Sequence, residues 1–335
     1  MSATATVRVM TPEEIAASAG GETPWLRWPQ RETVFAERRM RLAQLARGHA
    51  MEDFLRFMAE VARAQQVQLA AFPSVPLPDR AALARTAERG LPPLAAVDWP
   101  RDAAWRTALR ALVADLRRDA AGPVAAALDR LAAADDDTLE RQADCLLTGV
   151  TQGLDLASAP LVAAALQVYW THLLLAVQKA QPGSAAPFGR PDDPGLCPCC
   201  GSRPVASITR TAGGALGQRY LHCSLCGLEW HMVRAKCSHC GESKSIAYQS
   251  LEVPGAEDAG ARAAQAAVQA ETCESCGHYL KILHADRDPM VDAVADDLAS
   301  LTLDLLVAET GLQRHGHNLM LLFGEPEPPP PKEAS

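Results

Sequence analysis

The residues of this chain best suited to chemistry are eight cysteines arranged as four Cys-x-x-Cys pairs. The pairs are Cys197/Cys200, Cys223/Cys226, Cys237/Cys240 and Cys273/Cys276, and a glycine follows each of them at once. Two thiolates three residues apart can bind one metal ion from a tight turn, and the glycine supplies the positive φ that such a turn often needs. Four repeats of this pattern indicate two tetrahedral sites of four thiolates each.

The cysteine pairs can share their metals in two ways. The chain places 22 residues between Cys200 and Cys223 and 32 between Cys240 and Cys273, but only 10 between Cys226 and Cys237. Each of the two longer gaps can hold a β-hairpin, which would bring the cysteine pair before the gap close to the pair after it. We therefore expect sequential sites, the first formed by Cys197, Cys200, Cys223 and Cys226 and the second by Cys237, Cys240, Cys273 and Cys276. An interlaced arrangement, first pair with third and second with fourth, is the alternative.

The segments between the pairs have the composition of short strands and repeat in the same order. The first unit predicts strands over residues 204–210, 219–222 and 228–234, and the second over 245–251, 267–271 and 279–283. A ribbon of about 40 residues has too little core to fold well alone. A structural metal contributes roughly 10–16 kcal/mol at neutral pH, so we expect the metals to hold these units together.

Composition indicates a cytoplasmic metal-binding protein rather than a secreted disulfide protein. The chain has 335 residues, 48% of them hydrophobic and 21% charged, which suits two or three soluble domains. Its ten cysteines are clustered in a long chain, and the first ten residues lack the apolar core of a secretion signal. The net charge of −8 argues mildly against binding to nucleic acid.

The residues before the cysteine pairs carry helical patterns and predict an all-α domain. Thr11 is expected to cap a first helix, and the long apolar-periodic stretch 31–70 can be broken by Gly48. Further helices are expected over residues 79–89, 103–119, 124–134, 137–148 and 160–180. The run 161–177 is short for a membrane span, which needs about 20 apolar residues, and it contains polar side chains. We interpret it as a buried core helix and expect no membrane span.

The order and spacing of several runs are more specific than any single cysteine pair. They are FAERRMRLAQLARGHAMEDFLRFMAEVARAQQ from Phe35, CPCCGSRPVAS from Cys197, RYLHCSLCGLEWHMVRAKCSHCG from Arg219, ETCESCGHYLKIL from Glu271 and DPMVDAVADDLASLTLDLLVAETGLQRHGHN from Asp288. Together these runs resemble the formate dehydrogenase accessory protein family FdhE, and the resemblance spans roughly residues 10–324.

The resemblance implies a cytoplasmic maturation factor for respiratory formate dehydrogenases that depend on selenium or molybdenum. Members of the family contact the catalytic subunit of that enzyme before its export, and they are needed for its activity without being formate dehydrogenases themselves. The family fold implies two rubredoxin-like modules regarded as iron-binding, with the eight paired cysteines at the metal positions. The rubredoxin-like turn from Cys197 to Gly201 favours two iron ions, and zinc is the alternative metal.

The expected fold class is α+β multidomain. An all-α N-terminal domain (1–185) and a linker rich in proline and glycine (186–196) precede two tandem rubredoxin-like or zinc-ribbon β modules (197–236 and 237–287). A C-terminal helix (288–313) follows, with its helical pattern running from Asp288 to about Glu309, and a disordered proline-rich tail covers 325–335.

The sequence shows no nucleophile–base set, no phosphate-binding glycine loop and no catalytic pair of carboxylates, so we expect a protein that is not an enzyme. Four thiolates around a divalent ion carry a net charge of −2. We interpret the basic residues of the first unit as compensation for that charge, with docking of the catalytic subunit as the alternative. These residues are Arg203, Arg210, Arg219, Arg234 and Lys236.

The other cysteines and histidines are interpreted without a metal role. We expect Cys145 to be a buried free thiol and Cys199 to be a bystander in the first turn. We expect His231, His239 and His278 on the surface, and His315 and His317 in a loop.

Two other functions stay open at this point. A rubredoxin-like electron-transfer protein would need iron and a reversible colour change. A zinc-ribbon nucleic-acid binder would lose affinity steeply as salt rises, although we expect no nucleic-acid partner. A homodimer also stays open.

Overall fold

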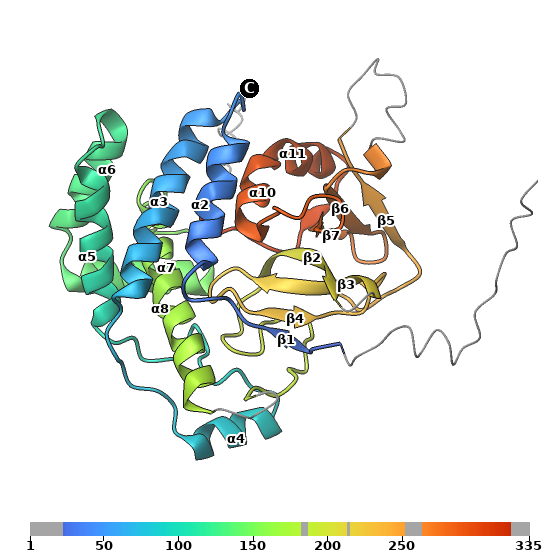
Figure 1. Ribbon diagram of the computed structural model, residues 1–335, viewed down its shortest axis with the longest axis horizontal. Coiled ribbons are helices and arrows are strands. Elements are labelled where there is room, and N and C mark those ends of the chain that lie inside the picture. The colour runs from blue at the N-terminus through green and yellow to red at the C-terminus, as the bar shows by residue number, and fades with distance from the viewer. Residues whose placement is uncertain (1–22, 182–186, 213–214, 252–262, 323–335) are drawn as a thin grey trace, which may run out of the picture.

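Helices and strands are segregated along the chain and in space. The computed structural model describes residues 23–181, 187–212, 215–251 and 263–322. Helices from the N-terminal part form one half of the molecule and the strands form the other, as Figure 1 shows. The predicted Thr11 cap and the tail 325–335 lie outside the described residues.

The helical half is built around α8 (Ala159–Ala180), which is buried along most of its length. It packs against α3, α5 and α7, with α2 and α6 packed outside them. By length and composition α8 could cross a membrane, but 83% of its most apolar stretch is buried inside the protein, in agreement with a core helix. The other helices of this half are α2 (Val34–Leu45), α3 (Glu52–Ala70), α4 (Arg80–Glu88), α5 (Ala104–Arg117), α6 (Gly122–Ala133) and α7 (Asp136–Thr148).

The predicted helices are found with ends shifted by only a few residues. The stretch 31–70 is broken at Gly48, whose φ is +69°. The prediction that the whole region before the cysteines is helical was wrong at one point. Residues Leu26–Arg27 form strand β1, which pairs with β4 through Leu26 opposite Trp230. A two-residue strand between Trp25 and Trp28 carries no periodic pattern that a sequence could reveal.

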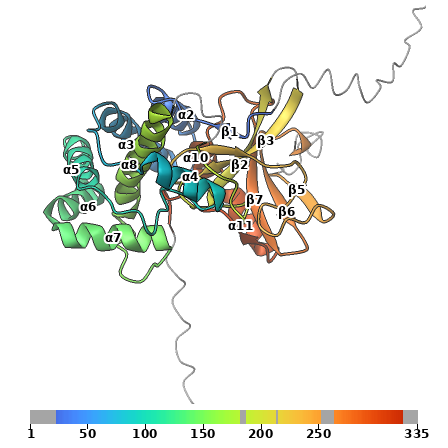
Figure 2. The ribbon, with the colours of Figure 1, turned by 90° about the horizontal axis from the view of Figure 1, so that it is seen from below.

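The strands of both cysteine modules form one continuous sheet. Its strands are β1, β2 (Pro204–Ala212), β3 (Ala215–Cys223), β4 (Glu229–His231), β5 (Ile246–Gln249), β6 (Val268–Cys273), β7 (His278–His284) and β8 (Gln313–Arg314). The order is β1-β4-β3-β2-β7-β6-β5, and β8 pairs with β7. Figure 2 shows these strands together on the side of the molecule away from α5 and α6.

The junction between the modules is a parallel pairing of β2 with β7. Ser207 lies opposite Ile282, and Thr209 lies opposite His284. The two tandem ribbons expected from the sequence are therefore not separate units, because their hairpins hydrogen-bond side by side. Strand boundaries also differ from those predicted: the strand expected over 228–234 contains only Glu229–His231.

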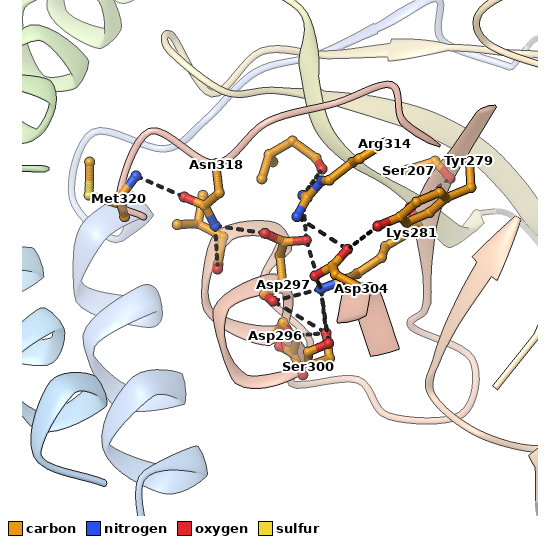
Figure 3. Close-up of polar contacts among 12 residues, drawn as sticks. Ser207, Tyr279, Lys281, Asp296, Asp297, Ser300, Asp304, Arg314, Asn318 and Met320 are labelled. Atoms are coloured by element: carbon orange, nitrogen blue, oxygen red, sulfur yellow. Dashed lines mark hydrogen bonds and ion pairs between the residues drawn. The ribbon is translucent and has the colours of Figure 1, made fainter. Parts of the chain in front are cut away.

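The segment after the second module forms two short helices instead of the one predicted from Asp288. They are α10 (Ala293–Ala299) and α11 (Leu301–Glu309). The Asp292 carboxylate accepts hydrogen bonds from the amides of Val294 and Ala295, so the helix starts later than expected. The break at Ser300 arises because the Lys281 ammonium donates hydrogen bonds to the carbonyl oxygens of Asp297 and Ser300, at 2.8 and 3.1 Å (Figure 3).

Lys281 belongs to a buried ionic network that fastens these helices to the sheet (Figure 3). The lysine side chain is fully buried and pairs with both Asp297 and Asp304. Arg314 of β8 binds the same two carboxylates. Two cations facing two carboxylates leave no unpaired charge among these four residues, which is the condition for burying charge without a large penalty.

The segment 187–196, predicted as a linker, is packed against the rest of the protein. A Cβ atom built on Gly189 would come within 1.9 Å of the Ala87 carbonyl oxygen. The Phe188 ring lies 5.6 Å from that of Trp28, and the Pro194 carbonyl accepts a hydrogen bond from the Trp230 indole at 2.9 Å. These contacts fix the position from which the first cysteine pair starts.

Candidate metal centres

The four cysteine pairs lie in tight turns, which we call knuckles. The glycines that follow them, Gly201, Gly227, Gly241 and Gly277, have φ between +70° and +76°, a region in which a side chain is strained. The amides of Gly201, Gly241 and Gly277 donate to the carbonyl of the first cysteine of their pair at 2.8–3.0 Å. The predicted need for glycine at these positions is confirmed.

The eight sulfurs gather in the sequential arrangement, as two groups of four. In the first group Cys200 Sγ lies 3.4 Å from Cys223 Sγ, and Cys197 Sγ lies 3.6 Å from Cys226 Sγ. In the second group the corresponding distances are 3.7 Å for Cys240–Cys273 and 3.8 Å for Cys237–Cys276.

These spacings test whether a metal fits. Metal–sulfur bonds of about 2.3 Å place the ligands of a tetrahedral site about 3.8 Å apart, close to the separations found. Disulfide sulfurs would lie about 2.05 Å apart, and all eight cysteines are free. Each donor set therefore fits one tetrahedral ion held by four sulfurs.

The first sulfur group is enclosed by the helical half. Cys197, Cys200, Cys223 and Cys226 are all buried. The amides of Leu94 and Ala96 donate to the carbonyls of Cys199 and Cys200 at 3.0 and 2.9 Å. From α8, the Gln167 side chain donates to the Ser224 carbonyl at 2.8 Å, and the Thr171 hydroxyl donates to the Cys226 carbonyl at 3.2 Å. Both knuckles of this group are thus hydrogen-bonded to the helical half.

Gln167 and Thr171 are among the polar side chains of the run 161–177, which in the sequence spoke only against a membrane span. Their polarity inside an apolar helix has a specific cause, because each satisfies a backbone carbonyl of the second knuckle. A polar residue in an otherwise apolar core helix was the signal for such a contact, but the sequence could not identify its partner.

The second sulfur group reaches the surface. Cys240 is exposed and Cys276 is half-buried, whereas Cys237 and Cys273 are buried. The backbone amide of His239 donates to Cys237 Sγ at 3.4 Å. Solvent, a small reagent or a partner protein can therefore reach this group, while all four cysteines of the first group are buried.

Three imidazole rings lie beside the second group. The His239 ring is 4.0 Å from that of His278 and 4.9 Å from that of His315. His315 lies in a loop, as predicted, directly after β8. It is nevertheless buried, because β8 pairs with β7 and the His315 amide donates to the Tyr279 carbonyl at 2.8 Å. Its distance along the chain from the cysteines hid this neighbourhood from sequence reasoning.

The thiols of each group have different affinities for protons. Burial raises the pKa of Cys197 and of Cys226 well above the usual value, while hydrogen bonds from neighbouring thiols lower that of Cys200 in spite of its burial. In the second group burial raises the pKa of Cys276 to about 12. Hydrogen bonding from the backbone lowers the pKa of Cys240. Since a metal ligand must be a thiolate, metal binding at either group releases protons.

The basic residues of the first module differ from their predicted role. Arg210 forms an ion pair with the buried Glu229, and Arg219 forms one with the buried Glu271. Arg203 lies 3.0 Å from His315 Nδ1. The interpretation that these residues offset the sulfur charge was therefore wrong for Arg210 and Arg219, because buried carboxylates already neutralise them.

Neither Cys199 nor Cys145 joins a sulfur group. Cys199 is buried beside the first group without belonging to it, and burial raises the pKa of its thiol to about 11. Cys145 is partly exposed instead of buried, and its thiol donates to the Gln152 carbonyl at 3.7 Å. Its helix lies at the edge of the helical half, where an apolar sequence pattern does not ensure full burial.

Comparison with protein families finds matches along almost the entire described chain. Residues 23–186 match the family model "FdhE, N-terminal", residues 196–234 match "FdhE, central domain" and residues 235–321 match "FdhE, C-terminal domain".

Similar proteins and a similar solved structure carry the same family name. The protein FdhE homolog of Pseudomonas aeruginosa is 43% identical over 316 residues, which cover 94% of this chain and 98% of that protein. The protein FdhE of Salmonella dublin is 38% identical over 325 residues, covering 96% and 99%. The crystal structure of the FdhE protein from Pseudomonas aeruginosa matches with a TM-score of 0.76 and covers 89% of this chain and 99% of that one.

Proposed function

Because this chain belongs to the FdhE family, and is thereby a formate dehydrogenase accessory protein, we propose that it binds the catalytic subunit of a respiratory formate dehydrogenase and supports its maturation. The role is that of a maturation factor rather than a catalyst, and it is carried out in the cytoplasm before the subunit is exported. The observation that carries this proposal is the family match over all three parts of the chain.

We propose that the eight paired cysteines hold two metal ions, with iron favoured over zinc. The spacing of the sulfurs supports this assignment, since each group has the dimensions of one tetrahedral tetrathiolate site. When bound, the ions supply structural cross-links, and iron would add a one-electron redox couple. Four protein ligands per ion leave no open position for a substrate, which favours an accessory role over metal-assisted hydrolysis.

The two groups support different tasks. The first is enclosed by the helical half and suits a structural role, in which its ion fixes the sheet against α8. The second has the exposed ligand Cys240 and suits contact with the catalytic subunit. We place the partner interface on the second module for this reason.

Co-purification with the catalytic subunit tests this proposal. Affinity-tagged chain is expected to retain the subunit, and Cys237→Ala or Cys273→Ala is expected to reduce recovery at least tenfold. Cys145→Ala is the matched control, because this cysteine lies outside both sulfur groups. Circular dichroism would confirm that the variants remain folded. Full recovery of the subunit by a folded variant with an empty second group would contradict an interface on that module.

Exposure of Cys240 also favours a second candidate function, electron transfer through a rubredoxin-like iron centre. This function requires iron in the second group, with a reversible change in its visible spectrum on reduction. Chain purified after expression at native level would be assayed for metal content and titrated with dithionite. Zinc as the only metal, in protein that still supports formate dehydrogenase activity, would exclude electron transfer.

A further inference from the structure

Two adjoining cavities form one groove between the helical half and the first module. Their volumes are about 300 and 470 Å³. They share part of their lining, contributed by Leu147 at the end of α7 and by Leu196, Gly201 and Ser202 around the first knuckle. We call this combined feature the α7 groove.

The two ends of the α7 groove differ in chemistry. One end is lined by the basic side chain of Arg203, by Leu319 and by His317. Burial lowers the pKa of His317 to about 4, so this imidazole is neutral and can donate a hydrogen bond. The other end is lined mostly by apolar residues of the segment 91–99, including Pro92, Pro93 and Trp99, and also by Asp98 and Cys200. Leu91 and Val97 at that end are 51% and 59% exposed, which is unusual for large apolar side chains that line a cavity.

The C-terminal segment starts at the basic end of this groove. The described chain ends at Leu322, three residues after Leu319, which lines that end. The remaining residues, 323–335, read FGEPEPPPPKEAS. The carboxylates of Glu325 and Glu327 come first, and four consecutive prolines, 328–331, come next.

The order of residues in this segment matches the order of surfaces in the groove. The two carboxylates would meet the guanidinium of Arg203 and the N–H of the neutral His317 imidazole. The prolines would then reach Trp99 and its neighbouring prolines. Proline-rich chain adopts an extended helix that rises about 3.1 Å per residue, so the nine residues 323–331 reach roughly 28 Å. Such segments bind in grooves lined by aromatic side chains, because they lose little entropy on binding.

We propose that residues 323–335 bind along the α7 groove of the same chain, with Glu325 and Glu327 at its basic end and the prolines at its apolar end. Tethering places the segment at an effective concentration in the millimolar range, so modest contacts suffice to keep it bound. This inference concerns the chain by itself and does not depend on the function proposed above.

Calorimetric titration with a synthetic peptide of residues 323–335 tests the proposal. A chain that ends at Leu322 should bind the peptide with a Kd below about 1 mM, the concentration that tethering provides. The chain that extends to Ser335 should bind it at least tenfold more weakly, because its own segment competes. Absence of binding to the shortened chain at several millimolar, or equal binding to both chains, would overturn the proposal.

Matched variants locate the binding site. In the shortened chain, Val97→Asp should weaken binding at least tenfold, whereas Leu305→Asp on α11 should leave it unchanged. The two side chains are equally exposed, at 59% and 58%, so neither substitution disturbs the core. A peptide carrying Glu325→Lys and Glu327→Lys should also bind at least tenfold more weakly. An effect of Leu305→Asp equal to that of Val97→Asp would reject this groove as the site.

Sedimentation of the shortened chain tests whether a second copy of the chain, instead of residues 323–335, occupies the α7 groove. If a second copy of the chain fills the groove, the shortened chain will dimerise, Val97→Asp will prevent the dimer, and the peptide will not bind. That outcome would also overturn the proposal. A monomeric shortened chain that binds the peptide is the expected result.

Discussion

Arg219 of β3 and Glu271 of β6 form a buried ion pair that joins the two cysteine modules. Arg219 Nη2 lies 2.6 Å from Glu271 Oε1, and the side chains are 0% and 3% exposed. Arg219 Nη1 also donates to the carbonyl of Lys236 at 2.7 Å, at the point where one module passes into the next. The guanidinium thus holds both the second module and the segment that connects it to the first.

Removal of Arg219 alone is expected to destabilise the protein severely. Burial raises the pKa of Glu271, and without the guanidinium this carboxyl would be left unpaired. We expect Arg219→Met to lower the free energy of unfolding by about 3–5 kcal/mol, as for other broken buried pairs. Urea denaturation followed by circular dichroism measures the change.

Two controls separate the buried charge from other effects. The double variant Arg219→Met, Glu271→Leu should recover most of the lost stability, because no unpaired charge remains. Arg117→Ala breaks the exposed pair with Asp129 and should produce no measurable change. A double variant as unstable as Arg219→Met would show that the hydrogen bond to Lys236 dominates.

Chelation is expected to remove the two metals in two phases. The second sulfur group is exposed at Cys240, while the first is enclosed by α8 and the 91–99 segment. Metal release from the second group should therefore be at least tenfold faster, with little change in helical circular dichroism during that phase. Cys240→Ala should lack the fast phase, and Cys200→Ala should reduce soluble protein. A single phase for both metals would contradict this difference in access.

Acidification is expected to destabilise the protein well above the range where carboxylates titrate. Burial, reinforced by the nearby Arg31 cation, lowers the pKa of His172 to about 4. Because the unfolded chain has the ordinary histidine pKa of about 6.5, it binds the proton more strongly than the folded chain does. Stability is therefore lost as pH falls from about 6.5 to about 4, and His172 accounts for about 2 kcal/mol of the loss at pH 5.

His172→Gln tests this contribution, since glutamine keeps an acceptor for Arg31 but does not titrate. The loss of stability between pH 7 and pH 5 should be about 2 kcal/mol smaller in the variant than in the unaltered chain. Between pH 7 and pH 8 the two proteins should respond alike. Metal loss affects both proteins alike and therefore cancels in this comparison. An identical acid response of the two proteins would mean that His172 is already protonated in the folded protein at pH 5.

The sequence by itself determined the features that depend on local pattern. Cys-x-x-Cys spacing followed by glycine specified the knuckles, because a short turn leaves few ways to aim two sulfurs at one point. The sequential grouping followed from gap lengths that admit a hairpin. Apolar periodicity located α3, α5 and α8 within a few residues, since burying one helix face requires that spacing.

Tertiary structure decided everything that depends on contacts between distant segments. No local pattern pairs Ser207 with Ile282, so the fusion of two ribbons into one sheet was invisible in the sequence. Cys240 is exposed and Cys200 is buried because α8 and the segment 91–99 cover one sulfur group and not the other. Likewise, Arg219 in the sequence was only a nearby positive charge, and its role depends on Glu271, which folding brings within 2.6 Å of it.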